Sequence, residues 1–473
     1  MTNLYSRLVA HTLFPLHERL MQRPTFDYLD ELEKSQWLSR AGVEQLQMHK
    51  LKLLLQSAEQ HSPWHAERIQ AASLELRSDT PLTLETLRRL PTMTKQDASR
   101  NIEQLVWRDI PGGAFKYNTG GSSGQPLIFY YGRLRQASDA AGRIRARRWW
   151  GIDVGDREIY LWGSPVELNK TGRIKTLRDR LLNQLVLNAF DMSIANMDAY
   201  IKAIHEFQPK CIYGYASSLA LLAAHTGERG IKLRLPSLKV VCTTGEPLYP
   251  HQRKLIEDIF GVPAANEFGS RDSGFIAHET PDGQMLLMSE STLLEVLDAQ
   301  GNPVAPGESG EAVITGLCSY AQPFIRYRTG DVVRYANDTC KAGRGLHVIG
   351  EVMGRTTDFV VRSDGTIMHA LAVIYVLRAT EGIDEFKFIQ HSIQDVEIFV
   401  VRNPDWTEQS PDKIISGIQA RLGNNVRIKL QFVDLIPPEA SGKYRYVVSH
   451  VPLQSGLNSA LQKSPSTIRP EKI

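Results

Sequence analysis

The chain has 473 residues, of which 42% are hydrophobic, enough for sizeable cores and for more than one domain. Its 55 Lys and Arg residues nearly balance 52 Asp and Glu residues, which leaves a formal net charge of +3. So small an excess excludes a strongly basic nucleic-acid-binding or membrane-surface protein.

The first hundred or so residues are predicted to be helical and amphipathic. Leu46, Leu51 and residues 53–55 mark one apolar helix, and residues 91–95 interrupt the pattern before the next helix. This region contains no pattern that indicates chemistry.

A loop of glycine and hydroxyl residues lies between two predicted strands, 114–117 and 127–131. Glycines let backbone N–H groups approach an anion, and Thr119, Ser122 and Ser123 add hydroxyl donors for phosphate oxygens. The loop lacks the Gly-Lys-Ser/Thr ending of a P-loop and opens no helix, which excludes Walker-type and Rossmann-type sites. We predict a phosphate cradle, with a flexible Gly/Ser turn as the alternative.

A basic cluster follows in a predicted helix that ends at two tryptophans. Its members are Arg143, Arg145, Arg147 and Arg148. Such clusters are usually solvated helix faces, and this interpretation is preferred to a grip on nucleotide phosphates.

Strands and helices alternate from about residue 113 onward. The predicted strands are 158–162, 211–215, 239–243 and 264–268, and the predicted helices are 199–207, 218–225 and 251–260. This rhythm predicts an α/β core with parallel strands. Ligands bind beyond the carboxyl ends of such strands, so the loops 215–217, 244–247 and 268–270 together form a candidate cleft.

The rest of the chain divides into smaller units. Short strands from residue 285 to about 335 predict a small β subdomain. From residue 354 the order is strand, helix 371–380, strands 385–391 and 396–401, helix 412–422 and strand 426–432. We predict an N-terminal domain over 1–353 (helical segment 1–110, α/β core 111–284, β subdomain 285–353), an α+β domain over 354–451 and a loose tail over 452–473.

The cysteines and apolar runs bear on the compartment. The four cysteines, at positions 211, 242, 318 and 340, have no C-x-x-C spacing, so neither a disulfide framework nor a zinc knuckle is indicated. No stretch has the order of a signal peptide, and no apolar run approaches about 20 residues. We expect a soluble cytoplasmic protein without a membrane span.

Four further segments complete a recognisable series: 266–272 (Asn-Glu-Phe-Gly-Ser-Arg-Asp), 324–331 (Phe-Ile-Arg-Tyr-Arg-Thr-Gly-Asp), 354–358 (Gly-Arg-Thr-Thr-Asp) and 441–445 (Ser-Gly-Lys-Tyr-Arg). Read alone, each is a turn, hairpin, linker or surface loop. With the Gly/Ser loop, and in this order, they resemble the adenylate-forming enzymes: acyl-CoA synthetases, luciferases and peptide-synthetase adenylation domains. Residues 90–95, residues 213–217, the N-terminal helices and the short length look most like the phenylacetate-CoA ligase branch and its capsular-polysaccharide relatives.

The resemblance, which covers about residues 45–450, implies nucleotide-binding residues. It implies that the β- and γ-phosphates of ATP are bound by Thr119, Gly121, Ser122, Ser123 and Gly124. It implies that Gly245, Glu246 and Pro247 line adenine and that the base stacks on Phe268. The neighbouring residues Glu267, Gly269 and Ser270 are also implied to bind the nucleotide. The resemblance also implies that Asp331 accepts both ribose hydroxyls and that Arg355 contacts the nucleotide near a hinge.

The same resemblance implies the reacting groups. Asp272 takes the position of the family's metal-binding glutamate and would hold Mg²⁺ against the α-phosphate. Lys443 matches the lysine that reaches the oxygen bridging the carboxylate and the α-phosphate, where a cation lowers the barrier between two anions. The acid pocket would be bordered by Tyr213, Tyr215, Ala216 and Gly245, which suggests an aromatic or medium-sized apolar acid.

Several positions depart from the family pattern. Leu127 stands where a lysine or threonine usually follows the loop's proline, and Asp272 is one methylene shorter than glutamate. The hinge acid is replaced by Thr357, with Asp358 next to it. Only Cys340 remains where some relatives carry a zinc cluster, so no zinc is predicted.

The leading hypothesis is an AMP-forming ligase that joins a carboxylic acid to coenzyme A, using ATP and Mg²⁺, with a mobile C-terminal domain that turns between the two steps. An amide ligase acting on an amino sugar or amino acid, in polysaccharide or natural-product biosynthesis, is the first alternative. A non-catalytic nucleotide-binding protein is the second, and the retention of Asp331, Arg355 and Lys443 argues against it. A homodimer is compatible with the sequence, and no nucleic-acid partner is expected.

Overall fold

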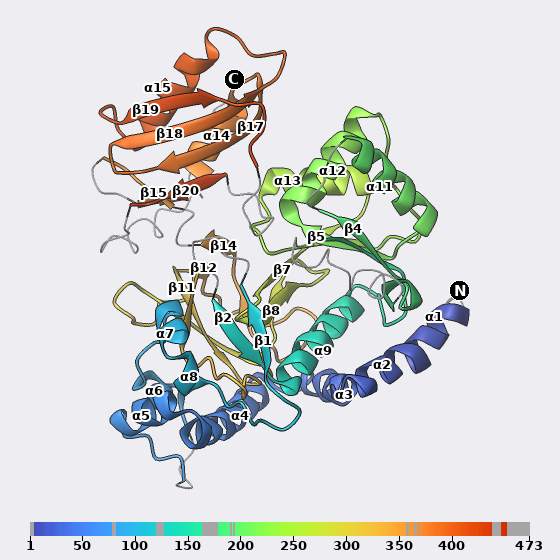
Figure 1. Cartoon of the computed structure of the whole chain (residues 1–473), viewed down its shortest axis with the longest axis vertical. Helices are drawn as coiled ribbons and strands as arrows, with labels where there is room; N and C mark the ends of the chain where they lie inside the picture. The colour runs from blue at the N-terminus through green and yellow to red at the C-terminus, as the bar shows by residue number, and fades with distance from the viewer. Residues whose placement is uncertain are drawn as a thin grey trace.

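The computed structural model describes residues 4–77, 82–119, 127–162, 178–189, 192, 194–355, 359–363, 367–369, 371–437 and 446–451. Figure 1 shows an N-terminal part built around a large sheet, with a separate smaller sheet near the C-terminus. None of the helices in these ranges combines the length and apolar character that a bilayer crossing requires.

The large sheet has eight strands in the order β13-β9-β8-β7-β6-β5-β3-β4. They are β3 (Glu158–Trp162), β4 (Gln184–Asn188), β5 (Cys211–Tyr215), β6 (Val240–Thr244), β7 (Ala264–Ser270), β8 (Gly274–Glu279), β9 (Met285–Leu287) and β13 (Val348–Ile349). The strands from β4 to β7 pair in parallel, and the other three add antiparallel. Every residue of β5 and β6 is buried, as expected for parallel strands covered on both faces.

Helices cover the two faces of this sheet. The helices α11 (Ile194–Phe207), α12 (Ala216–Glu228) and α13 (Pro250–Phe260) pack on one face over an apolar core that includes Ile159, Ile212 and Val241. The helix α9 (Arg133–Trp149) lies against β8 on the other side (Figure 1). Because side chains alternate along a strand, the residues between those apolar positions, such as Tyr160 and Tyr213, belong to the opposite face.

Gly214 fixes how closely the central strands approach. A Cβ atom at this position would lie 2.6 Å from the Leu161 carbonyl oxygen of the neighbouring strand β3. That separation is shorter than any normal contact, so β3 and β5 can pair here only because residue 214 has no side chain.

The N-terminal segment forms α1 (Leu4–Leu8), a π-helical turn (Val9–Leu13), α2 (Phe14–Leu20), α3 (Thr25–Ser35), α4 (Arg40–His61), α5 (Pro63–Ala71), α6 (Leu84–Arg88), α7 (Lys95–Arg100) and α8 (Ile102–Leu105). In α4, Leu51, Leu54 and Leu55 are buried while Leu53 is exposed, so the apolar stripe runs on one face. Thr94 begins α7 with a capping box to Asp97. The helix α3 packs along α9.

Two smaller sheets accompany the large sheet in the described N-terminal part. The hairpin β1 (Phe115–Asn118) and β2 (Ile128–Tyr131) is one, and β10 (Thr292–Leu297), β11 (Ser309–Gly316), β12 (Tyr327–Arg334) and β14 (Val352–Arg355) form another. The predicted β subdomain is therefore only partly separate, because β9, at its start, joins the large sheet through β8. Asp331 lies within β12 rather than in a hairpin turn.

The C-terminal unit has its own sheet, in the order β19-β18-β17-β20, and its own core. Its elements are β15 (Phe359–Val361), β16 (Ile367–His369), α14 (Leu371–Ala379), β17 (Ile383–Gln390), β18 (Asp395–Arg402), α15 (Ser410–Leu422), β19 (Arg427–Phe432) and β20 (Val447–Ser449). The predicted α/β class, with an α+β unit at the C-terminus, is confirmed. The predicted tail, 452–473, lies outside the described residues.

Candidate functional site

The carboxyl ends of three parallel strands meet as the sequence predicts. Tyr215 of β5 is in register with Thr244 of β6, and Thr244 is in register with Glu267 of β7. Glu267 accepts hydrogen bonds from the Tyr213 hydroxyl (2.8 Å) and the Thr244 hydroxyl (3.0 Å). The ring of Tyr215 stacks on Trp162 with centroids 4.4 Å apart. The acid-pocket candidate Tyr213 and the nucleotide candidate Glu267 therefore form a hydrogen-bonded row with Thr244.

Glu267 is buried but is held in its charged form. Burial opposes ionisation, yet the guanidinium groups of Arg143 and Arg147, together with His278 and the Tyr213 hydroxyl, lower the pKa of Glu267. Burial raises the pKa of Tyr213, and the adjacent Glu267 charge raises it further, so this hydroxyl remains a donor. The row of Tyr213, Thr244 and Glu267 thus places an ionised carboxylate and two fixed hydroxyl donors at the strand ends.

The turn after β6 is stabilised by its own residues. Gly245 has φ +74°, a left-handed conformation that glycine adopts without strain. The Glu246 carboxylate accepts a hydrogen bond from the Ser217 N–H (2.9 Å), in the first turn of α12. A carboxylate there complements the positive end of the helix and ties two strand-end loops together.

Asp272 lies just beyond β7 and is nearly saturated with donors. Its Oδ1 accepts from the Ser270 hydroxyl (2.6 Å) and the Ser273 N–H (3.1 Å), and its Oδ2 accepts from the Tyr327 hydroxyl (2.8 Å). A carboxylate offers about four acceptor positions, so one remains.

The residues around Asp272 set a limit on metal binding. The described residues contain no group of three or more His, Cys, Asp or Glu side chains that could hold an ion. The free acceptor position therefore fits Mg²⁺ that keeps its other ligands from phosphates and water, which is the usual way proteins bind this ion with nucleotides. It does not fit an ion held by the protein alone.

The hairpin that carries the Gly/Ser loop reaches this same place. Arg271 donates a hydrogen bond to the Asn118 carbonyl (3.4 Å), next to Thr119. Thr119 closes the base of the loop, because its N–H donates to the Leu127 carbonyl (2.9 Å) and its hydroxyl accepts from the Leu127 N–H (2.8 Å). Leu127 itself is buried, which explains a leucine at that position. Gly121, Ser122, Ser123 and Gly124 lie outside the described residues.

Two further nucleotide candidates are brought together by a strand pair. Asp331 of β12 is the register partner of Arg355 in β14, and the Asp331 N–H donates to the Thr329 hydroxyl (3.0 Å). Phe268 packs instead among Leu127, Ile276 and Tyr327, and only 6% of it is exposed. Its ring offers little surface to a base, and its stacking role stays a prediction. Lys443 lies outside the described residues.

The arginines of α9 overturn the solvated-face interpretation. Arg145 is fully buried and forms a bidentate pair with Glu290 (2.6 and 3.0 Å), and Arg147 is 3% exposed. The row Arg135, Asp139, Arg143 and Arg147, spaced by four residues, carries charge along one side of the helix, and its members pair with one another or with sheet residues. That spacing was the signal that could have found them in the sequence.

The chain is similar to several known proteins. Residues 360–450 match the family model described as CapK C-terminal domain. Protein CapK from Staphylococcus aureus is 22% identical over 436 residues, covering 91% of this chain and 94% of that protein. The phenylacetate-coenzyme A ligase of Pseudomonas putida is 25% identical over 334 residues, or 68% of this chain and 74% of that protein.

A solved structure of 2-hydroxyisobutyryl-CoA ligase, in the postadenylation state in complex with R3-HIB-AMP, has the same fold. Its TM-score is 0.69 at 21% identity, and the match covers 91% of this chain and 94% of that one. The chain therefore shares the fold of this CoA ligase over most of its length. In sequence it is similar to CapK and the phenylacetate-CoA ligases, as the motif order predicted.

Proposed function

We propose that this adenylate-forming protein is an ATP-dependent, AMP-forming ligase that activates a carboxylic acid and transfers the acyl group to coenzyme A. One observation carries the proposal: the Gly/Ser hairpin is bonded through Asn118 to Arg271, beside Asp272, so the predicted phosphate loop begins at the strand ends that hold Glu267. The similarity to phenylacetate-coenzyme A ligases supports the same reaction class.

The proposed chemistry has two balanced steps. A carboxylate oxygen attacks the α-phosphorus of ATP, and pyrophosphate leaves. A thiolate then attacks the acyl carbon, and AMP leaves. Mg²⁺, when bound with ATP, would supply charge neutralisation at the phosphates.

Individual residues of the chain take separate parts in this proposal. Asp272 offers one carboxylate position toward the phosphates, while Tyr327 and Ser270 hold that carboxylate in place. Asp331 accepts the ribose hydroxyls, and Lys443 stabilises the charge that develops between the carboxylate and the α-phosphate. Turning of the C-terminal domain between the steps would withdraw Lys443 and admit the thiol.

The first test is ATP–pyrophosphate exchange across a library of carboxylic acids, with wild type and Lys443→Ala. We expect acid-dependent exchange in wild type and a loss of about 10²-fold or more in the variant, because one preorganised charge is removed. The variant should melt at the wild-type temperature and still bind ATP. ATP binding without exchange for any acid would instead favour a non-catalytic nucleotide-binding protein.

A second test identifies the acceptor. The enzyme is incubated with ATP and an accepted acid, together with coenzyme A or with amino sugars and amino acids, and the products are weighed by mass spectrometry. We expect the thioester. Amide formation without any thioester would assign the chain to the amide ligases. The proposed homodimer is checked separately by analytical ultracentrifugation.

A further inference from the structure

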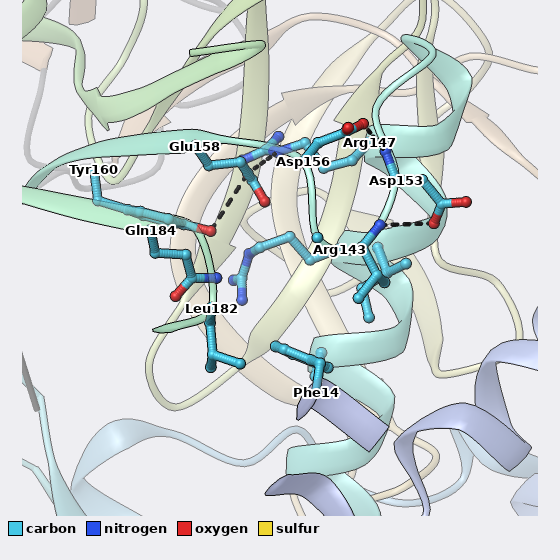
Figure 2. Close-up of a pocket in the computed structure, with 13 residues that line it drawn as sticks. Phe14, Arg143, Arg147, Asp153, Asp156, Glu158, Tyr160, Leu182 and Gln184 are labelled. Atoms are coloured by element: carbon cyan, nitrogen blue, oxygen red, sulfur yellow. Dashed lines mark hydrogen bonds and ion pairs between the residues drawn. The ribbon is translucent and has the colours of Figure 1, made fainter. Parts of the chain in front are cut away.

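A cavity of about 170 Å³ lies between α9 and the first residues of β3 and β4. Figure 2 shows Arg143 extending from the helix toward Gln184, with Tyr160 and Glu158 beside them. A cavity of about 150 Å³ holds one benzene molecule, so this one has room for a group of roughly six heavy atoms.

The cavity adjoins the strand-end row. Arg143 lines it and also pairs with Glu267, with Nε and Oε2 3.6 Å apart. Tyr160 lines it too, is in register with Tyr213, and its ring centroid lies 5.5 Å from that of Tyr213. Only one layer of side chains, which includes Arg143 and Tyr160, therefore lies between the cavity and a ligand carboxylate at the strand ends.

Arg143 keeps hydrogen-bonding capacity toward the cavity, although it forms a long ion pair with Glu267. Its Nε has no hydrogen-bond partner, and it makes no hydrogen bond to any other described residue. Its guanidinium lies 5.2 Å from the Phe275 ring centroid, and 36% of its side chain is exposed. The Gln184 side chain is likewise without a hydrogen bond among the described residues.

Glu267 is the ion-pair partner of Arg143, and none of the acidic groups that line the cavity pairs with it. Asp153 is paired with Arg148 (2.8 Å) and Asp156 with Lys210 (2.7 Å). Glu158 contacts Arg147 at 3.4 Å, and its burial raises its pKa, which disfavours its charged form. The cavity therefore offers hydrogen-bond donors to a ligand, and it suits a ligand group that accepts hydrogen bonds.

We infer that the acid activated by this enzyme is small and polar, with a hydroxyl or second carboxylate at its far end that accepts hydrogen bonds from Arg143 and Gln184. This inference rests on the proposed function and replaces the aromatic or apolar acid that the sequence suggested. An acid with an apolar tail would leave the two donors without partners, and a site built for hydrogen bonds discriminates strongly against such a ligand.

The test compares three acids with the same five-carbon chain: glutaric, 5-hydroxypentanoic and pentanoic acid. In pyrophosphate exchange we expect kcat/KM for at least one polar acid to exceed that for pentanoic acid by about 10-fold or more, since binding to a built polar site discriminates at least that much. Preference for glutaric acid would assign a carboxylate, and preference for the hydroxy acid a hydroxyl. Equal rates for all three, or a preference for pentanoic acid, would overturn the inference while the proposed function stands.

Two variants test whether the preference for polar acids depends on Arg143. Arg143→Gln should reduce the preference about 10-fold or more. Arg108→Gln should leave it unchanged, because Arg108 pairs with Glu103 at the surface and does not line the cavity. A preference that survives Arg143→Gln would contradict the assignment, provided the variant keeps the wild-type melting temperature.

A binding measurement separates this inference from the proposed function. If no acid supports exchange, the ligase proposal fails, and calorimetry of glutaric acid with wild type and Arg143→Gln then tests the cavity. We expect about 10-fold weaker binding by the variant. Equal affinity of the two proteins, or no binding of glutaric acid to wild type, would mean that Arg143 binds no such acceptor in the cavity.

Discussion

Arg143 and Arg145 lie two residues apart on the same helix, yet the protein uses them in opposite ways. Arg145 gives both terminal nitrogens to Glu290 and a further hydrogen bond to the Leu32 carbonyl, and its side chain is fully buried. Arg143 meets Glu267 only at 3.6 Å and keeps a third of its side chain exposed. Arg145 joins α9 to α3 and to the turn between β9 and β10, and Arg143 lines a cavity. Residue type and sequence neighbourhood therefore do not separate a structural cation from a binding one.

The largest effect should come from Arg145→Met. Removing one partner leaves the buried Glu290 charge without its main counter-ion, which typically costs about 3–5 kcal/mol. Urea unfolding measures this loss. The double variant Arg145→Met/Glu290→Leu should recover much of it, because an apolar pair of similar volume replaces two buried charges. A single-variant loss below about 1 kcal/mol would mean that the pair contributes like a surface one.

Arg143→Gln should affect stability much less. Its contact with Glu267 is long, and Arg147 also stabilises that carboxylate, so we expect a smaller loss of unfolding free energy than the about 3–5 kcal/mol for Arg145→Met. Glu267 keeps Tyr213 and Thr244 as donors in the variant. Loss of stability as large as in Arg145→Met would make Arg143 a structural residue and remove the contrast.

The smallest effects concern pH, and the two helix-facing acids should respond in opposite directions. Burial opposes ionisation of Glu290, but Arg145 holds its pKa below the ordinary 4.5. Its contribution to stability is therefore present above 4.5 and lost as the pH falls through the folded-state value. Burial raises the pKa of Glu158 above 4.5, so its contribution is present below 4.5 and lost as the pH rises through the folded-state value.

Urea unfolding of Glu290→Gln and Glu158→Gln at several pH values checks these signs. The deficit of Glu290→Gln relative to wild type should shrink as the pH falls below 4.5. Relative to wild type, Glu158→Gln should gain stability as the pH rises above 4.5. Curves that run parallel to wild type at all pH values would contradict both directions.

Much of the fold could be predicted because the apolar residues of some segments recur with the period of a strand or of a helix. The strands Glu158–Trp162 and Cys211–Tyr215 were predicted to the residue, and the helices of the same core differ from the prediction mainly at their ends. The strand Gln184–Asn188 was missed, since its short apolar run of Leu-Val-Leu fits a helix as well as a strand. The antiparallel addition of β8 was also missed, because pairing is a tertiary property.

The site was predictable in part for a similar reason. Strand-end loops are positioned by topology, so the row of Tyr213, Thr244 and Glu267 followed from the alternation of elements. The enclosed ring of Phe268 and the burial of Arg145 did not, since both depend on which neighbours the fold supplies. The Gly/Ser loop residues and Lys443 lie outside the described residues, and their roles stay predictions.

Gly214 has a practical consequence for anyone who wishes to alter what this protein accepts. Randomised libraries would naturally target the two tyrosines that flank it, at 213 and 215, because they border the strand ends. Diversifying the intervening position as well would fill the library with clones whose sheet cannot close, since even alanine would collide with the Leu161 carbonyl. Substrate range can be engineered on either side of residue 214, while that residue itself stays fixed.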